Sequence, residues 1–356
     1  MLILTNKAVL RKSMVVAAMA VCAVWFHCLG TIGPEAGEGS DSTYWSADTV
    51  LGEGFDTHRF DMGTDYSGKV VSTLIRHRSE CGDSVGVLYV HGFNDYFFQK
   101  DEAERFADSC YHFYAVDLRK YGRSILPGQK VAQVRDLKEY FPDIDSALMV
   151  MKRDGIKEVM LMGHSTGGLV TSYYMSEQPD SVVKSLVLNS PFLEWNMGWA
   201  MRKVAVPFVG WLGRFFPGMS ISTGGGSGYG ESLLKDYHGE WEFNTDWKSI
   251  TPRKVEFSWL NAISRGQKQV RGNRVKVPVL LMHSSESVSC GDWNEKLQHG
   301  DAVLNVDDMK KYGPQLGPDV WLHEVPGGMH DLFLSAEDAR EDAYEATFKF
   351  LRDVMR

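Results

Sequence analysis

The stretch Val159–Val170, VMLMGHSTGGLV, decides the fold that this sequence predicts. An apolar run leads into Gly-His-Ser-Thr-Gly, and small residues and valine follow. A short apolar run that ends at glycine is typical of a strand buried on both faces. The stretch therefore predicts a strand that turns sharply into a helix, with Ser165 at the bend.

The pattern Gly-x-Ser-x-Gly between a strand and a helix is typical of a nucleophilic serine. Bulky side chains in place of Gly163 and Gly167 would collide with adjacent elements at so sharp a turn. The first turn of a helix directs free N–H groups outward, so the N–H of Thr166 is a candidate oxyanion donor. We interpret Ser165 as the candidate nucleophile. The alternative is a chance match in a glycine-rich turn, since the chain has 35 glycines.

Strands and helices alternate on both sides of this stretch. Runs that predict strands lie at Lys69–Arg78, Val85–Phe93, His112–Ser124, Val182–Phe192, Val277–Ser285 and Val320–Val325. Helical patterns lie between them, and a final helix starts at a capping box formed by Ser335 and Asp338. This alternation predicts an α/β fold with a mostly parallel sheet flanked by helices.

The alternation stops over residues 193–273, which are rich in tryptophan and phenylalanine. This segment predicts an inserted helical cap over the carboxyl-terminal edge of the sheet. The cap divides the core into a first part, residues 51–192, and a second part, residues 274–356.

Within the cap, the aromatic stretch Trp195–Gly218 predicts an amphipathic helix pair. One interpretation is that this pair simply packs on the main domain. The other is that it faces lipid, where Arg202, Lys203 and Arg214 would meet anionic head groups.

A serine hydroxyl is a weak nucleophile without an adjacent base. The segment Glu324–Phe333, EVPGGMHDLF, places His330 on a Gly-Gly loop after the last predicted strand. This position fits the chain order serine, acid, histidine, so His330 is the candidate base. A capping or core histidine is the alternative. The other histidines fit the role of base less well. His91 precedes the expected oxyanion loop, and His164 is the chain neighbour of Ser165 and is expected to point elsewhere. Structural roles are predicted for His238 and His283.

The acid of the site stays open. The position after the predicted strand Val277–Ser285 holds Ser-Glu-Ser rather than an aspartate, so Glu286 is one candidate. We favour Asp301, which opens a segment of two apolar residues and a polar helix start, with residues 288–300 as an insertion before it. Asp292 and Asp307 are further alternatives. An acid here would orient His330 and stabilise its protonated form.

A second oxyanion donor is expected in the loop His91–Asn94, which follows the predicted strand GVLYV. Gly92 permits a tight turn, and the backbone N–H of Phe93 is the candidate donor. The alternative is an ordinary strand-to-helix turn.

The motifs VLYVHGFND, DLRKYGRS, GHSTGG, LNSPF and GGMHDLF resemble the α/β-hydrolase superfamily, and within it the monoglyceride lipase, lysophospholipase and serine aminopeptidase-like branch. The resemblance covers Ser72–Met355. It implies a serine hydrolase that forms an acyl-enzyme intermediate and needs no metal or organic cofactor. The sequence departs from the family pattern at the acid, because no aspartate follows LLMHSSES.

The expected activity is hydrolysis of carboxylic esters, such as monoacylglycerols, lysophospholipids or other acyl esters. A peptidase that releases N-terminal residues is the alternative, with Glu194 or Glu231 as candidates to bind the substrate ammonium. A non-catalytic binding protein on the same scaffold is a third hypothesis. The net charge of −8 argues against a nucleic-acid partner, and a serine at position 165 disfavours a haloalkane dehalogenase.

The N-terminal segment carries Lys7, Arg11 and Lys12 before an apolar stretch, Met14–Phe26. This order predicts a secretory signal or a membrane anchor over residues 1–30, followed by a polar linker, residues 31–50. An exported or membrane-anchored protein is therefore expected, and a cytoplasmic N-terminal helix is the alternative.

Three cysteines follow this segment, Cys81, Cys110 and Cys290, and none has metal-ligand spacing. Cys81 and Cys110 each precede a predicted strand, and those strands are expected to be neighbours. A disulfide between them is a hypothesis that fits an oxidising compartment. The alternative is three unpaired thiols.

Overall fold

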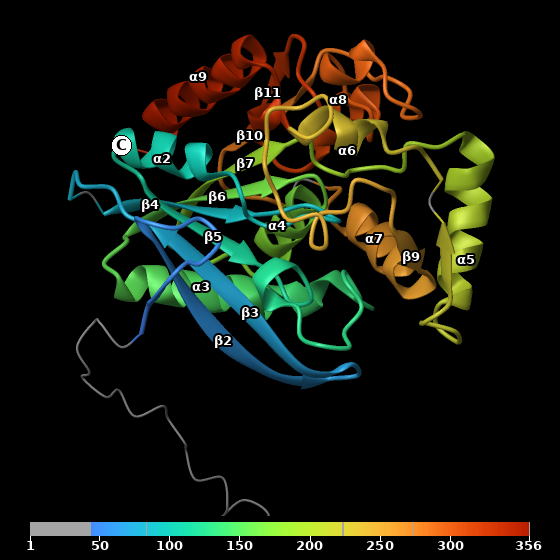
Figure 1. Cartoon of the computed structure of the whole chain (residues 1–356), viewed down its shortest axis with the longest axis horizontal. Helices are drawn as coiled ribbons and strands as arrows, with labels where there is room; N and C mark the ends of the chain where they lie inside the picture. The colour runs from blue at the N-terminus through green and yellow to red at the C-terminus, as the bar shows by residue number, and fades with distance from the viewer. Residues whose placement is uncertain (1–43, 83, 223, 273, 356) are drawn as a thin grey trace, which may run out of the picture. The chain divides into compact units, whose positions relative to one another are not determined.

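A mixed sheet of nine strands lies at the centre of the residues that the computed structural model describes, which are 44–82, 84–222, 224–272 and 274–355 (Figure 1). In spatial order the strands are β1 (Ser46–Ala47), β2 (Phe55–Asp65), β3 (Gly68–His77), β5 (His112–Asp117), β4 (Val85–Val90), β6 (Glu158–His164), β7 (Val183–Asn189), β10 (Val279–Ser284) and β11 (Val320–Val325). All pairs from β5 to β11 are parallel, and β1, β2 and β3 are antiparallel. The predicted α/β fold with a mostly parallel sheet is confirmed.

The central strands are buried because helices cover both faces of the sheet. Every residue of β6 from Val159 onward is buried, as the unbroken apolar run predicts. Helices α2 (Lys100–Asp108) and α9 (Glu337–Val354) lie on one side, and α3 (Phe141–Arg153) lies on the other (Figure 1). Helix α4 (Thr166–Glu177) packs against α3, where Phe141 meets Tyr173 and Tyr174 edge to face.

The edge strands β1 and β2 are not predicted from the sequence. Strand β2 is polar and only partly buried, so it carries no clear alternation of apolar residues. Residues 45–50 were assigned to the linker, yet Trp45 and Asp48 are buried and β1 pairs with β2. That part of the linker prediction is wrong. The ion pair between Asp48 and Arg123 anchors the segment to the core.

The insertion between β7 and β10 forms the cap. Its elements are a π-helical turn (Met201–Ala205), α5 (Val206–Leu212), β8 (Ser220–Ser222), α6 (Gly228–Leu233), β9 (Lys254–Glu256) and α7 (Phe257–Gln269). The predicted helix pair within Trp195–Gly218 is wrong, because the π-helical turn runs directly into α5 as one helical segment. Helix α7 lies between α5 and the sheet (Figure 1).

The predicted capping box at the final helix is also wrong. The residue before α9 is Ala336, and no side chain caps the helix. Instead, the Ser335 hydroxyl accepts the N–H of Met329 at 2.8 Å and donates to the carbonyl of Asp331 at 3.1 Å. Ser335 is therefore engaged in closing the loop that carries His330.

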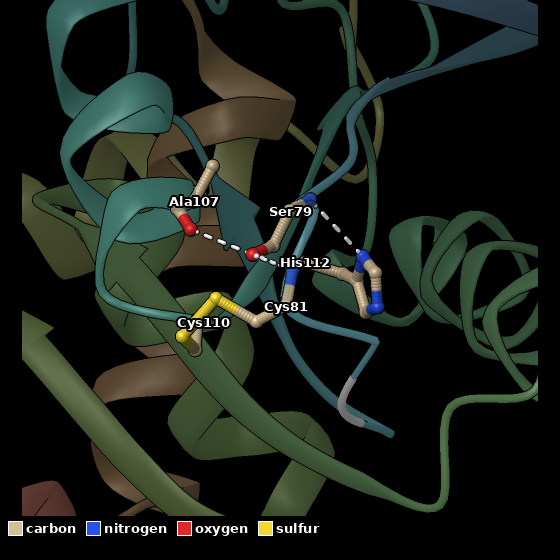
Figure 2. The surroundings of a disulfide bond; sticks show 5 residues. All are labelled: Ser79, Cys81, Ala107, Cys110 and His112. Atoms are coloured by element: carbon tan, nitrogen blue, oxygen red, sulfur yellow. Dashed lines mark hydrogen bonds between the residues drawn. A yellow bond between two sulfur atoms is a disulfide. The ribbon is translucent and has the colours of Figure 1, made fainter.

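A disulfide joins Cys81 to Cys110 across a Cα–Cα distance of 5.3 Å (Figure 2). It links the segment after β3 to the turn between α2 and β5. Ser79 supports the same junction, since its hydroxyl donates to the carbonyl of Ala107 at 2.7 Å and its N–H donates to the His112 ring at 3.2 Å (Figure 2).

The predicted signal or anchor, residues 1–30, and the linker up to residue 43 lie outside the described residues. Within the residues that the structure does describe, no helix has the length and apolar character needed to cross a membrane.

Candidate active site

Ser165 occupies a strained bend between β6 and α4. Its φ of 53° and ψ of −116° place a non-glycine residue in a region that L-amino acids rarely adopt. Backbone hydrogen bonds hold it there: its N–H donates to Asn189 at 2.9 Å, and its carbonyl accepts the N–H of Phe192 at 3.0 Å. The end of β7 and the segment that follows it therefore hold Ser165 in its strained backbone conformation.

The two glycines of the bend lie where the backbone approaches other elements closely. A Cβ on Gly163 would lie 2.5 Å from the Thr171 hydroxyl, and a Cβ on Gly167 would lie 2.2 Å from the carbonyl oxygen of Val90. Both distances are far below van der Waals contact. The Gly-x-Ser-x-Gly spacing is therefore a packing requirement of this turn.

His330 lies between Ser165 and Asp301. Its Nε2 is 2.9 Å from the Ser165 Oγ, and its Nδ1 is 3.0 Å from Asp301 Oδ2. All three side chains are buried. Low solvent access keeps water from competing for these hydrogen bonds. The structure thus brings together the candidate nucleophile, base and favoured acid, although they are far apart in the sequence.

Asp301 reaches this position because the chain returns to the end of β10 after a long excursion. Its N–H donates to the Glu286 carbonyl at 2.9 Å, and its own carbonyl accepts the N–H of Val288 at 2.9 Å. Residues 289–300 loop out between these contacts. The second carboxylate oxygen accepts the N–H groups of Val303 at 2.8 Å and Leu304 at 2.7 Å.

The other candidate acids do not contact His330. Glu286 is exposed and has no side-chain hydrogen bond to His330 within the described residues. Asp307 is exposed in the first turn of α8 (Val306–Tyr312), and Asp292 is exposed in the loop that Asp301 closes. Asp301 alone of the four candidates meets the imidazole.

The two candidate oxyanion donors line the same pocket as Ser165 and His330. Thr166 is the first residue of α4, so its N–H has no intrahelical acceptor. Neither the Thr166 N–H nor the Phe93 N–H donates to another backbone group in the described part of the chain. Gly92 allows the loop to approach, since a Cβ there would lie 3.1 Å from the Ser165 Cβ.

The pocket above Ser165 has a volume of about 630 Å³ and lies between the sheet edge and the cap. Large apolar side chains form much of its wall: Phe93, Phe192, Trp195, Leu233, Phe243 and Trp259. Its charged lining residues are Lys248 and Arg253, and none of the described residues that line it is a carboxylate. Glu194 instead contacts Arg271 at 3.3 Å, and Glu231 contacts Ser227.

Two residues that the sequence analysis did not single out fix the His330 loop. Asp331 accepts a hydrogen bond from the Asn189 amide at 2.7 Å, and the Asn189 amide oxygen accepts the N–H of Leu332 at 3.2 Å. Asn189 lies in the motif LNSPF and Asp331 in the motif GGMHDLF, but neither motif by itself predicts that the two residues contact each other. Together they tie the histidine loop to β7.

The His164 ring lies 5.0 Å from the His330 ring and is close to two buried carboxylates. Its Nδ1 is 3.5 Å from Asp95 Oδ2 and 3.7 Å from Asp331 Oδ2. Burial alone would lower the pKa of His164, but Asp331 and Asp95 outweigh it and raise the pKa above 6.5. Two carboxylates thus favour the protonated form of His164. In the described residues no group of three or more His, Cys, Asp or Glu could hold a metal ion.

Comparison with known proteins places the chain in a family. The sequence model of the family described as serine aminopeptidase, S33, matches residues 85–337. Mouse epoxide hydrolase 4 is 29% identical over 105 residues, which cover 30% of this chain and 28% of that protein. The chain thus aligns with under a third of the length of that curated relative.

Solved structures with the same fold include two lipases. A soluble variant of monoglyceride lipase from Saccharomyces cerevisiae, in complex with a substrate analogue, is 18% identical and has a TM-score of 0.63 over 83% of this chain and 95% of that chain. The monoacylglycerol lipase of Paleococcus ferrophilus is 22% identical, with a TM-score of 0.55 over 83% and 98%. The chain belongs to the serine aminopeptidase S33 family of α/β hydrolases.

Proposed function

We propose that this protein is a serine hydrolase of carboxylic esters, with Ser165 as nucleophile, His330 as base and Asp301 as the acid that orients it. The observation that carries the proposal is the continuous hydrogen-bonded relay from Asp301 to His330 at 3.0 Å and from His330 to Ser165 at 2.9 Å. The relay ends on the floor of an apolar pocket. A buried relay of this order activates a serine hydroxyl.

The reaction proceeds in two halves. The Ser165 Oγ attacks the ester carbonyl carbon while His330 Nε2 takes its proton, and the N–H groups of Phe93 and Thr166 bind the oxyanion. His330 then gives this proton to the leaving alkoxide as the ester C–O bond breaks, which leaves an acyl group on Ser165. Water, deprotonated by His330, then attacks the acyl carbonyl carbon. His330 returns the proton to the Ser165 Oγ as the bond between this oxygen and the acyl group breaks, which releases the carboxylic acid and restores the enzyme.

The charge of the pocket favours an ester over a peptide with a free N-terminus. An aminopeptidase has to bind the α-ammonium of its substrate, and a carboxylate is the usual partner for a buried ammonium. The lining offers the cations Lys248 and Arg253, and the residues proposed for this task, Glu194 and Glu231, are engaged elsewhere. Release of N-terminal residues stays the second candidate function because of the family to which the chain belongs.

The substrate we propose is an acyl ester such as a monoacylglycerol or a lysophospholipid. A pocket of about 630 Å³ lined by Phe192, Trp195 and Trp259 offers apolar surface to an acyl chain. The two lipases of the same fold support this class, although their likeness to this chain is one of fold.

The test compares the full-length protein with its Ser165→Ala variant on p-nitrophenyl esters and aminoacyl-anilides. We expect the variant to lose ester turnover by a factor of about 10³ or more. Ser146→Ala is a matched control, since Ser146 lies on α3 and its hydroxyl donates to the Pro142 carbonyl at 2.7 Å. Undiminished ester turnover by Ser165→Ala would refute the proposal. Faster cleavage of aminoacyl-anilides than of esters would select the peptidase instead.

We also propose that the outer face of the cap contacts an anionic lipid surface. The side chains of Trp199, Phe208, Trp211 and Phe215 are each at least 50% exposed, and Phe208 and Trp211 belong to α5. Helix α5 lies at the outside of the cap (Figure 1). Residues 195–230 contain the cations Arg202, Lys203 and Arg214 and no Asp or Glu, within a chain of net charge −8. Arg202 pairs with Asp308 at 2.7 Å, and Lys203 lies 3.6 Å from Glu194. Exposed aromatic side chains with flanking cations suit a membrane interface.

Vesicle sedimentation tests this surface. Binding to vesicles that contain phosphatidylglycerol should fall in a Phe208→Ser, Trp211→Ser variant and persist in Trp321→Ser, which changes an exposed tryptophan on β11. Equal binding by all three proteins would contradict the proposal.

Export from the cytoplasm is the localisation we propose, through the N-terminal segment predicted as a signal or anchor. The Cys81–Cys110 disulfide supports it, because disulfides persist mainly in oxidising compartments. Recovery of the native protein from the cytosolic fraction with both thiols free would contradict it.

A further inference from the structure

The candidate oxyanion donor Phe93 lies in the loop between β4 and α2. Side chains of this loop form hydrogen bonds and an ion pair with one segment of the cap, residues 244–253. We call this segment the clasp. The first bonds are made by Asn94, directly after Phe93. Its amide donates to the Ser249 carbonyl at 2.7 Å, and its amide oxygen accepts the Ser249 N–H at 3.0 Å. Arg253 donates to the same amide oxygen. Asn94 thus pairs with the clasp as a strand residue pairs with its neighbour.

The next two loop residues, Asp95 and Tyr96, also contact the clasp through their side chains. Asp95 forms a buried ion pair with Lys248 at 2.7 Å, and the Tyr96 hydroxyl accepts the N–H of Asn244 at 2.8 Å. The other oxygen of Asp95 faces His164, the neighbour of Ser165, at 3.5 Å. Burial alone would raise the pKa of Asp95, but nearby charges, of which Lys248 has the largest effect, hold it below its usual range. Three consecutive loop residues are therefore fixed from the cap.

Contacts with the core hold the two ends of this loop, and in its middle Asp95 also faces His164 of β6. At one end the ring of His91 accepts the N–H of Leu118 at 3.1 Å, and at the other the N–H of Phe97 donates to Asp117 at 2.8 Å. Asn94, between them, has a φ of 53°, in the left-handed region that asparagine tolerates better than most residues. The direction of the Phe93 N–H depends on this part of the loop.

We propose that the clasp sets the oxyanion hole: Asn94 is a positioning residue that, through Ser249, aims the Phe93 N–H at the oxyanion. This inference rests on the proposed ester hydrolysis and assigns the cap a part in the chemistry beyond covering the pocket. A displaced donor stabilises the transition state less while leaving the apolar walls that bind the acyl chain in place. The cap and the catalytic loop act as one unit.

The central experiment replaces Asn94 by glycine, which keeps the left-handed backbone accessible and removes only the amide. We expect kcat to fall about 10- to 100-fold, less than the loss of about 10²- to 10³-fold expected when an oxyanion donor is deleted outright, with KM within about threefold. The affinity for a trifluoromethyl ketone, which forms a tetrahedral oxyanion on the serine, should fall by a similar factor. Active-site titration corrects for any unfolded fraction.

Two further variants sharpen the comparison. Tyr96→Phe removes the clasp bond farthest from Phe93 and should lower kcat by less than Asn94→Gly does. Asn294→Gly removes an amide that caps a short 3₁₀ turn (Glu295–Gln298) outside the pocket, and its kinetics should match the wild type. Wild-type kcat and ketone affinity in Asn94→Gly would overturn the proposal.

Failure of the clasp and failure of the proposed function give different results. Ester turnover by Ser165→Ala in the same assay would end the proposed function, whatever Asn94→Gly does. Hydrogen exchange over residues 92–97 tests the clasp without any chemistry, and we expect faster exchange in Asn94→Gly than in Asn294→Gly. Unchanged exchange in this peptide would overturn the clasp even if the protein cleaves esters.

Discussion

Replacement of Asp301 by asparagine tests how the acid controls the imidazole. The Asp301 oxygen that accepts the N–H groups of Val303 at 2.8 Å and Leu304 at 2.7 Å would remain an oxygen in the amide. The amide nitrogen would then face His330 Nδ1, 3.0 Å away in the wild type. Because that nitrogen donates, Nδ1 has to accept, and the imidazole proton moves to Nε2, opposite Ser165. His330 then cannot take the serine proton.

The expected loss in kcat is about 10³- to 10⁴-fold, or about 4 to 5.5 kcal/mol in transition-state stabilisation. Asp301 is fully buried, so water cannot replace the carboxylate. The assay is p-nitrophenyl ester hydrolysis at saturating substrate, with Glu286→Gln as the matched control for the competing acid. A loss under about tenfold in Asp301→Asn, or an equal loss in Glu286→Gln, would refute this account of the acid.

Three further predictions concern the bend, the disulfide and a buried acid. Gly167→Ala should lower both activity and melting temperature, because the added methyl overlaps a backbone carbonyl. Reduction of Cys81–Cys110, which are 29 residues apart, should cost about 3.5 kcal/mol of unfolding free energy in denaturant titrations. Burial raises the pKa of Glu102 well above 4.5, so the wild type loses stability as pH rises above 4.5. Glu102→Gln should therefore gain stability over wild type from pH 5 to pH 8, whereas Glu104→Gln, which changes a half-buried carboxylate on the same helix, should not.

The parallel part of the sheet is predictable because its strands are buried on both faces. An unbroken apolar run such as Val159–Met162 indicates a central strand, because a strand covered on both faces can be apolar at every position. Strand β2 gives no such signal, since it lies near the sheet edge with its side chains partly in solvent. The capping box at Ser335 fails for a different reason: a tertiary contact with Met329 and Asp331 takes the hydroxyl that the local pattern assigns to the helix.

The candidate site likewise contains residues that local motifs predict and residues that depend on contacts between distant segments. Ser165 and His330 are recognisable because each lies in a short motif whose local geometry is itself the requirement. Asp301 is only one candidate among four in the sequence, because its place depends on how far residues 289–300 loop out before the chain rejoins β10. The bonds between Asn94 and Ser249 join segments 155 residues apart, so no local sequence pattern in either segment predicts them.

Covalent labelling of the full-length protein with a fluorophosphonate, followed by peptide mapping, tests the central claim most directly. The account predicts a single adduct on the peptide that contains Ser165, no adduct in Ser165→Ala, and far slower labelling in His330→Gln. Labelling at another residue, or equal labelling rates in wild type and His330→Gln, would contradict it.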